Sequence, residues 1–313
     1  MEFNYKKVYS AAMLYAIITG LSFLFIKIAL RSSDPFDLLA HRFTAAFISM
    51  LIIYKVKGIR LNYDRKRIIK IIPISILYPL AFFAFQTFGL LYISSAEGGI
   101  LLAVSPIFTL ILAETILKEK TNILQKISIL ITVTGVIYIT IKKSTNLEFD
   151  NMLGVILLLL CALSISGYSV MARKVTREFS NIEITSMMIL ISFIAYNLLS
   201  IGKHAIKGTL SQFFMPFTSM SFIIAVLYLG VLSSLITSLM TNYILSKIEA
   251  SKMSVFANLG TVITIIAGAV ILKENVYYYH IIGSILIVGG VLGVNFLDKN
   301  AIERRKKAGG KDK

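Results

Sequence analysis

Ten apolar runs of about twenty residues follow one another along this chain, each long enough to cross a hydrocarbon core roughly 30 Å thick. Lipid offers no partner for bare backbone N–H and C=O groups, so each run must be helical. The runs are continuously apolar rather than alternating every second residue, which argues against spanning strands. We therefore predict an all-α polytopic membrane protein with ten transmembrane helices. The runs are 9–30, 36–54, 71–92, 96–117, 123–141, 153–172, 184–201, 220–244, 253–272 and 279–297.

Composition supports a membrane class. The chain is 57% hydrophobic and 15% charged, with a mean hydropathy of +0.80. A soluble domain is nearer to half apolar and a quarter charged. The first run carries no small-residue cleavage pattern, so it is not expected to be a removable signal peptide. Cys161 is the only cysteine, which excludes an intramolecular disulfide and a cysteine metal cluster.

The sequence contains an internal repeat. SAEGGILLAVSPIFTLILAETILKE (95–119) and ASKMSVFANLGTVITIIAGAVILKE (250–274) align without gaps, and TGLSFLFIK (19–27) matches SGYSVMARK (166–174). A duplicated apolar unit is typical of transporter folds that hold a substrate site between their halves. The longer alignment pairs Thr109 with Thr264, Ile111 with Ile266, Leu117 with Leu272, Lys118 with Lys273, Glu119 with Glu274 and, further on, Gly135 with Gly290.

The net charge of +16 invites a nucleic-acid interpretation, but the placement of the charges argues against one. With the N-terminus in the cytoplasm, the inner segments hold 24 of the 32 lysines and arginines and the outer segments hold seven. This is the positive-inside bias, which orients both termini to the cytoplasm. The basic tail KNAIERRKKAGGKDK is expected either to lie on anionic headgroups or to be solvated and disordered.

Ten helices divide into two units of five. Because five is odd, the second unit enters the membrane upside down, so the repeats are inverted about an axis in the membrane plane. We expect a first repeat at 1–145, a second repeat at 146–298 and a cytoplasmic tail at 299–313.

Several motifs resemble the ten-helix branch of the drug/metabolite transporter superfamily, built from two EamA-type domains. They are the G-x-S-F-x-x-x-K pattern of Gly20, Ser22, Phe23 and Lys27, His41-Arg42-Phe43, Ser105-Pro106 followed by Ala113, Lys118-Glu119, and Lys273-Glu274.

That resemblance covers roughly 9–297 and implies a bacterial inner-membrane carrier, usually an exporter of amino acids or other small metabolites. It also implies a central cavity lined by helices 1, 3, 4, 6, 8 and 9. Thr261 stands where the first half has Pro106, so the proline-linked kink of helix 4 is not carried over to helix 9.

Polar and aromatic side chains inside the spans are the candidates for substrate contact, because polar groups in a membrane usually face a protein interior or a water-filled cavity. Serine and threonine can instead bond their own helix or join helices, so a structural role stays open for each of them. The substrate-binding candidates are Tyr78, Phe82, Gln86, Ser105, Thr109, Tyr228, Ser234, Thr237, Ser238 and Asn258.

Three charged residues are candidates for coupling or gating. Lys27 lies near the end of helix 1, where it could snorkel to the interface. Arg42 begins helix 2 and could be an interfacial anchor. Glu114 is either an i,i+4 partner of Lys118 or a proton-linked carboxylate. Glu119 and Glu274 are expected to cap and anchor their helix ends against nearby cations.

Enzyme functions find little support. No phosphate-binding loop or nucleophile elbow is present, and the three histidines have no metal-ligand spacing. We therefore expect no metal and no cofactor, and a chain that acts as a monomer. The sequence favours a secondary transporter that exports small neutral or zwitterionic metabolites such as amino acids by alternating access. The alternatives are a proton-coupled multidrug or organic-cation exporter and a non-transporting membrane scaffold.

Overall fold

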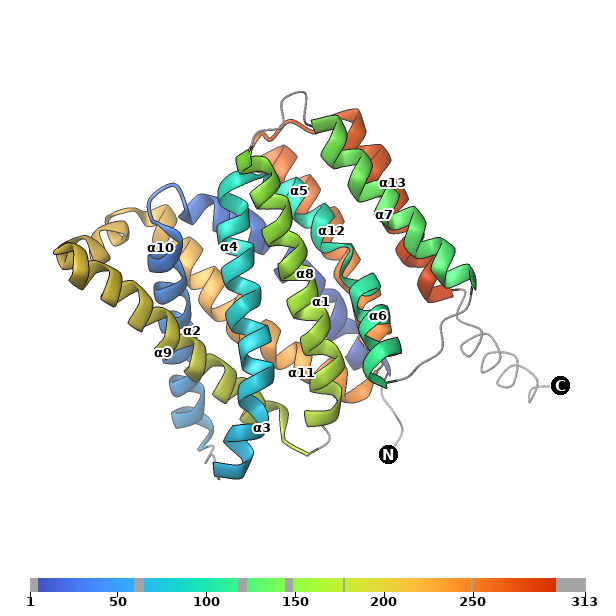
Figure 1. Cartoon of the computed structure of the whole chain (residues 1–313). Coiled ribbons are helices and arrows are strands. Elements are labelled where there is room, and N and C mark those ends of the chain that lie inside the picture. Colours follow the sequence, from blue (N-terminus) through green and yellow to red (C-terminus); the bar gives the residue numbers. More distant parts are fainter. Residues whose placement is uncertain are drawn as a thin grey trace.

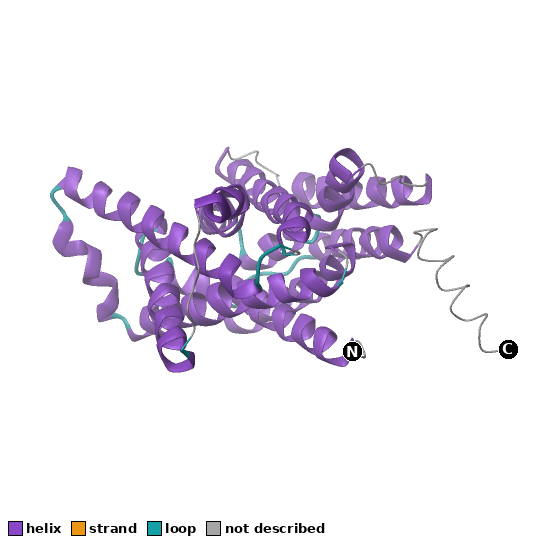
Figure 2. Ribbon diagram, turned by 90° about the horizontal axis from the view of Figure 1, so that it is seen from below, coloured by secondary structure: helices purple, strands orange, loops and turns teal. Residues whose placement is uncertain are grey.

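The computed structural model describes residues 5–58, 65–117, 123–143, 149–176, 178–248 and 250–296, and every regular element in these ranges is a helix (Figures 1 and 2). The predicted tail at 299–313 lies outside them. The elements are α1 (Tyr5–Ala29), α2 (Pro35–Lys57), α3 (Arg65–Ser75), η1 (Ile76–Ala81), α4 (Phe82–Tyr92), α5 (Ser95–Leu102), α6 (Ser105–Leu117), α7 (Ile123–Lys143), α8 (Phe149–Val175), α9 (Asn181–Lys207), η2 (Leu210–Thr218), α10 (Met220–Leu227), η3 (Tyr228–Ile236), α11 (Thr237–Lys247), α12 (Ala250–Ile271) and α13 (Tyr278–Phe296).

Seven helical stretches are long and apolar enough to cross a membrane, and each falls on one of the predicted runs. They are Lys7–Ala29, Pro35–Val56, Ile68–Tyr92, Ser95–Ile116, Met152–Arg173, Asn181–Lys207 and Met220–Lys247. Three shorter apolar helices, Lys126–Ile139, Leu259–Ile271 and Tyr278–Gly290, overlap the remaining runs. The all-helical membrane class is thus confirmed, while the count of ten spans stays a prediction.

Local sequence signals set several helix ends. The Asp34 carboxylate caps α2 by accepting from Phe36 N at 2.9 Å, and Pro35 fills the first turn, where no N–H is needed. The same helix ends at Gly58, whose φ of 62° is a left-handed conformation that suits glycine. Helix α9 begins with a reciprocal capping box between Ser180 and Glu183.

Two spans that the repeat makes equivalent both depart from α-helical geometry near their middle. The span α3–η1–α4 bends at Tyr78, which has φ −143° and ψ 126° and is followed by Pro79, a residue without an N–H to continue the ladder. Its mate α10–η3–α11 is π-helical from Tyr228 to Ile236. Segments of this kind occur frequently at functional sites.

The two halves differ at the proline-linked kink. Helices α5 and α6 are separated just before Pro106, whereas α12 runs unbroken through Thr261. The absence of a break in α12 is the outcome that the missing proline predicts.

Helices α7 and α13 lie side by side along one flank of the molecule, away from α9 (Figure 1). The Thr132 hydroxyl of α7 reaches the Ile287 carbonyl of α13 at 3.4 Å. In the repeat alignment these two positions are mates. A two-fold axis between the halves would pass close to such a contact.

Glycines on either side of this contact bring the two backbones together. A Cβ on Gly135 would lie 2.9 Å from the Gly283 carbonyl oxygen, and a Cβ on Gly290 would lie 2.6 Å from that of Ser128. In the repeat alignment Gly135 is equivalent to Gly290 and Ser128 is equivalent to Gly283, so the two contacts are equivalent to each other. The contacts also step forward along α7 as they step back along α13, so the two helices run antiparallel.

We predict that Gly290→Ala lowers the free energy of unfolding by about 1–3 kcal/mol relative to Gly289→Ala, because the added methyl group overpacks a closed contact. Both changes raise helix propensity equally, by about 1 kcal/mol. Only Gly290 faces α7, since a Cβ on Gly289 meets no atom within 4 Å. Thermal unfolding midpoints of the two purified variants in detergent measure the difference. Equal midpoints would contradict the close packing of α7 on α13.

Candidate functional site

A cavity lies among α1, the α3–α4 span, α5 and α6, α8, η3 and α12. It encloses about 600 Å³, including the space open to solvent. These elements belong to the six helices that the family resemblance implies. The lining residues are Tyr15, Thr19, Gly20, Ser22, Phe23, Tyr78, Phe82, Phe83, Gln86, Gly99, Leu102, Ser105, Ile165, Ser233, Gly260, Thr261 and Thr264.

One wall of the cavity is a close crossing of α1 and α12. A Cβ on Gly20 would lie 2.6 Å from the Gly260 carbonyl oxygen, so only glycine fits without a shift. The Thr264 hydroxyl ties the crossing by donating to the Gly20 carbonyl at 2.8 Å. Thr261 donates in the same way to the Gly99 carbonyl at 3.0 Å, which joins α12 to α5.

The lining combines apolar side chains with a few hydrogen-bonding groups. Among the described residues that form it, none is acidic or basic. Gln86 is the most polar of them and is 1% exposed, and its Oε1 atom has no hydrogen-bond partner. A buried acceptor without a partner costs free energy, and a ligand with an N–H or O–H group can recover that loss.

Of the residues that the sequence selects, Tyr78, Phe82, Gln86 and Ser105 line the cavity. Thr109 is buried, but its hydroxyl bonds its own helix at the Ser105 carbonyl, 2.9 Å away. The backbone of Asn258 belongs to α12, while its side chain lies outside the described part of the structure.

The hydroxyl candidates of the eighth span, Ser234, Thr237 and Ser238, recur at helical spacing and are predicted to form one stripe. In the structure this stripe mostly joins helices. Ser234 accepts from Arg42 Nε at 2.7 Å, and Thr237 bonds the Ser233 carbonyl at 2.7 Å. Ser238 donates to the Tyr78 hydroxyl at 3.4 Å, so the third and eighth spans do meet. The residue that this span gives to the cavity is Ser233, one position before the predicted stripe.

The aromatic candidate of the same span, Tyr228, is not among the residues that line the cavity. Its hydroxyl donates to the Ile18 carbonyl of α1 at 2.9 Å, and its ring stacks on Phe25 with the ring centroids 4.0 Å apart. Tyr228 thus holds α1 against η3.

The three candidate coupling residues lie in different surroundings. Lys27 is half-buried in the last turn of α1, and Glu114 is exposed on α6 outside the cavity lining. Lys118, the expected partner of Glu114, lies outside the described residues. Arg42 is fully buried, so it is not the interfacial anchor that its place near the start of α2 allows.

Glu274 caps a helix of the other half. Its carboxylate accepts from Ser95 N at 2.9 Å, from Ser95 Oγ at 2.7 Å and from Ala96 N at 3.1 Å, at the start of α5. A carboxylate is favourable there because the first N–H groups of a helix have no partner within it. Its repeat mate Glu119 lies outside the described part of the chain.

Sequence reasoning missed the contribution of α1 as a set of cavity residues. Tyr15, Thr19, Gly20, Ser22 and Phe23 all line the cavity. The G-x-S-F motif points to this part of α1. The sequence of a single helix, however, does not indicate which motif residues face a cavity and which pack against a neighbouring helix.

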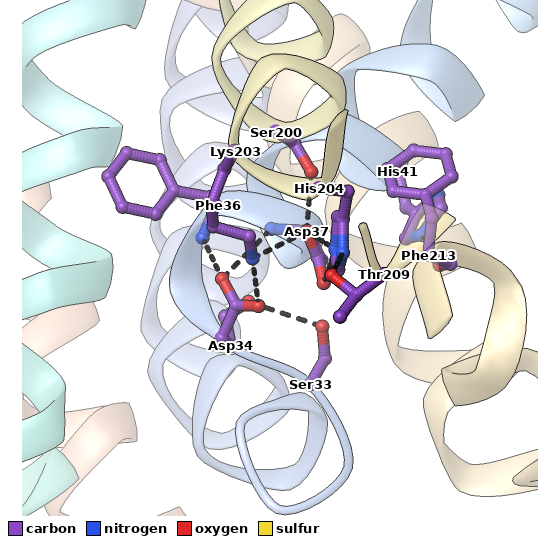
Figure 3. Close-up of polar contacts among 10 residues, drawn as sticks. All are labelled: Ser33, Asp34, Phe36, Asp37, His41, Ser200, Lys203, His204, Thr209 and Phe213. Carbon is purple, nitrogen blue, oxygen red and sulfur yellow. Dashed lines mark hydrogen bonds and ion pairs between the residues drawn. The ribbon is translucent and has the colours of Figure 1, made fainter. Parts of the chain in front are cut away.

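A polar cluster closes the end of the bundle where α2 begins and α9 ends (Figure 3). The buried Asp37 carboxylate accepts from Ser200 Oγ and from Lys203 Nζ, and it lies 2.9 Å from His204 Nε2. Lys203 also bridges to Asp34. The ligand atoms of Asp34, Asp37 and His204 lie within 4.8 Å of one another, as a metal site requires, but the Lys203 ammonium already bridges both carboxylates.

We predict that Asp37→Asn lowers the free energy of unfolding by about 3–5 kcal/mol, because it leaves the partly buried Lys203 cation without its inner partner. Asp34→Asn is the matched control. Asparagine also caps helices well, and the lost ion pair is partly exposed, so its cost should stay below about 1 kcal/mol. Chemical denaturation in mild detergent compares the two variants. A smaller loss for Asp37→Asn than for Asp34→Asn would contradict the assignment of Asp37 as the centre of the cluster.

Comparison with known proteins shows that the chain is similar to membrane transporters. The chain is 44% identical over 301 residues to the uncharacterized transporter YcxC of Bacillus subtilis (strain 168), covering 96% of each chain. It is 26% identical over 273 residues to an uncharacterized transporter of Archaeoglobus fulgidus, covering 87% of this chain and 92% of the relative.

The family model of the EamA-like transporter family matches residues 6–141 and again residues 152–296. The chain belongs to this family, which fits the drug/metabolite transporter superfamily. A solved crystal structure superposes with a TM-score of 0.62 over 90% of this chain and 98% of that chain. At 18% identity this likeness shows the fold alone.

Proposed function

We propose that the protein is a secondary carrier that moves small neutral or zwitterionic metabolites, amino acids first among them, out of the cell by alternating access. The observation that carries this proposal is the cavity between the two matched domains, with side chains from α1 and α5 on one side and from α8 and α12 on the other. A site at the interface of two repeats is typical of secondary transporters.

Two inverted repeats, at 1–145 and 146–298, supply the symmetry that alternating access uses. The antiparallel α7–α13 pair and the contact between the mates Thr132 and Ile287 support this arrangement. With an axis in the membrane plane, an opening towards one side has an equivalent opening towards the other.

The cavity chemistry favours a substrate with a small apolar body. Phe23, Phe82, Leu102 and Ile165 give apolar contact, and Gln86 offers an amide. An organic-cation exporter would gain from an acidic side chain, and the described lining residues include none. A non-transporting scaffold has no use for a cavity of this kind between its two domains.

The first test measures uptake of labelled apolar amino acids into proteoliposomes. Gln86→Ala should weaken substrate affinity about 5- to 150-fold, since it removes a buried hydrogen-bonding group worth about 1–3 kcal/mol. Ser192→Ala is the matched control, because Ser192 Oγ is also buried and without a partner but belongs to α9, away from the lining. Wild-type protein that takes up no tested substrate would overturn the proposed function.

We place the protein in the inner membrane as a monomer, with both termini and the basic tail on the cytoplasmic side. Cysteines at the exposed positions Lys55 and Lys207, in a Cys161→Ala background, test the orientation. An impermeant thiol reagent added to intact cells should label the cysteine at position 207 and spare the one at position 55. The opposite pattern would invert the topology without affecting the proposed cavity.

A further inference from the structure

Arg42 is a buried cation about two turns into α2. It lies in the second turn of α2, within the span Pro35–Val56, and its exposed fraction is 0%. Charged side chains at membrane depth are costly, and they usually pair with one another or mark the path of a substrate.

The partners of Arg42 are all neutral. Its Nε donates to Ser234 Oγ at 2.7 Å and its Nη2 donates to Ser233 Oγ at 2.9 Å. Its guanidinium carbon lies 3.7 Å from the centroid of the Phe83 ring. Among the residues that the structure describes, no carboxylate lies within ion-pair distance of the guanidinium. Its Nη1 has no hydrogen-bond partner.

The nearest acidic residue along α2 already has other hydrogen-bond and ion-pair partners. Asp37 lies just over one turn before Arg42 and is held by Ser200, Lys203 and His204. Lys203, the cation of the polar cluster, is thus paired with carboxylates, whereas Arg42 contacts hydroxyl groups and the face of an aromatic ring. A guanidinium with a free edge suits a carboxylate, which can accept two parallel hydrogen bonds.

Arg42 lies directly behind the cavity wall, because its partners Ser233 and Phe83 both line the cavity. The unpartnered Gln86 Oε1 belongs to the same lining. An unused acceptor therefore lies in the cavity lining, and an unused cationic donor lies behind the side chains that form the wall. An α-amino acid carries the two complementary groups, a carboxylate and an ammonium, on one carbon.

We infer that Arg42 binds the carboxylate of the substrate, with Gln86 Oε1 accepting from its ammonium group. This inference rests on the proposed function and narrows it, because a substrate without a free carboxylate leaves Arg42 uncompensated. Phe83 and Ser233 must shift to uncover Nη1, so carboxylate binding also repacks the contact between α2 and η3.

The test compares each of six apolar amino acids (alanine, valine, leucine, isoleucine, methionine and phenylalanine) with its own amide, by competition for uptake into proteoliposomes containing the full chain. Hydrogen bonds to a charged group are worth about 1.5–3 kcal/mol, so wild-type protein should prefer the acid about 10- to 150-fold. This comparison needs no variant, so it stands even if substitutions of Arg42 fail to fold.

Variants separate the two contacts. Arg42→Gln should weaken binding of the acid and leave binding of the amide unchanged, whereas Gln86→Ala should weaken both, since both carry the ammonium. Ser192→Ala should keep the wild-type preference. Equal affinity for acid and amide in wild-type protein would overturn the role of Arg42 and leave the carrier function standing. Binding of neither would overturn both.

Discussion

Close backbone contact between helices is the constraint on which this fold depends. Lipid tails are as apolar as leucine, so burial of apolar side chains gives membrane helices little reason to associate, and packing at small residues takes over. Here α1 meets α12 where Gly20 faces Gly260, and α7 meets α13 where Gly135 faces Gly283 and Gly290 faces Ser128. Threonine hydroxyls cross the same contacts, as Thr264 does to the Gly20 carbonyl. The first of these crossings is also a wall of the cavity.

The buried charges are arranged in two different ways. At one end of the bundle, Asp37, Lys203 and His204 satisfy one another and hold α2 against α9. Deeper in the same helix, the partners of Arg42 among the described residues are neutral, and one of its nitrogens is unbonded. The first arrangement is complete without a ligand and suits a fixed joint. The second is complete only when something else supplies negative charge, which suits a site that fills and empties.

Much of the architecture is predictable from the sequence because it depends on local physics. Run length and hydropathy give the spans, Asp34 and Gly58 mark the ends of α2, and Pro106 and Thr261 separate a broken helix from an unbroken one. The site is less predictable. Periodicity predicts the polar face of the eighth span. On that face, however, the Ser234 hydroxyl accepts from Arg42, and the Thr237 hydroxyl donates to a carbonyl of its own helix. Whether a buried polar group meets a partner or a space depends on helices distant in the sequence.

The contact of Thr132 with its own mate Ile287 bears on how such a chain arises. In an isologous interface, the kind that joins two identical subunits about a two-fold axis, residue i of one subunit meets residue j of the other and j meets i in the same way. Positions close to the axis meet their own equivalents, as Thr132 and Ile287 do. A five-helix protein of half this length, inserted in the membrane in both orientations, would meet a second copy of itself through this surface. Fusion of two copies into one gene then frees each side of the contact to change alone, as at Ser128 and Gly283, which are equivalent in position and no longer alike.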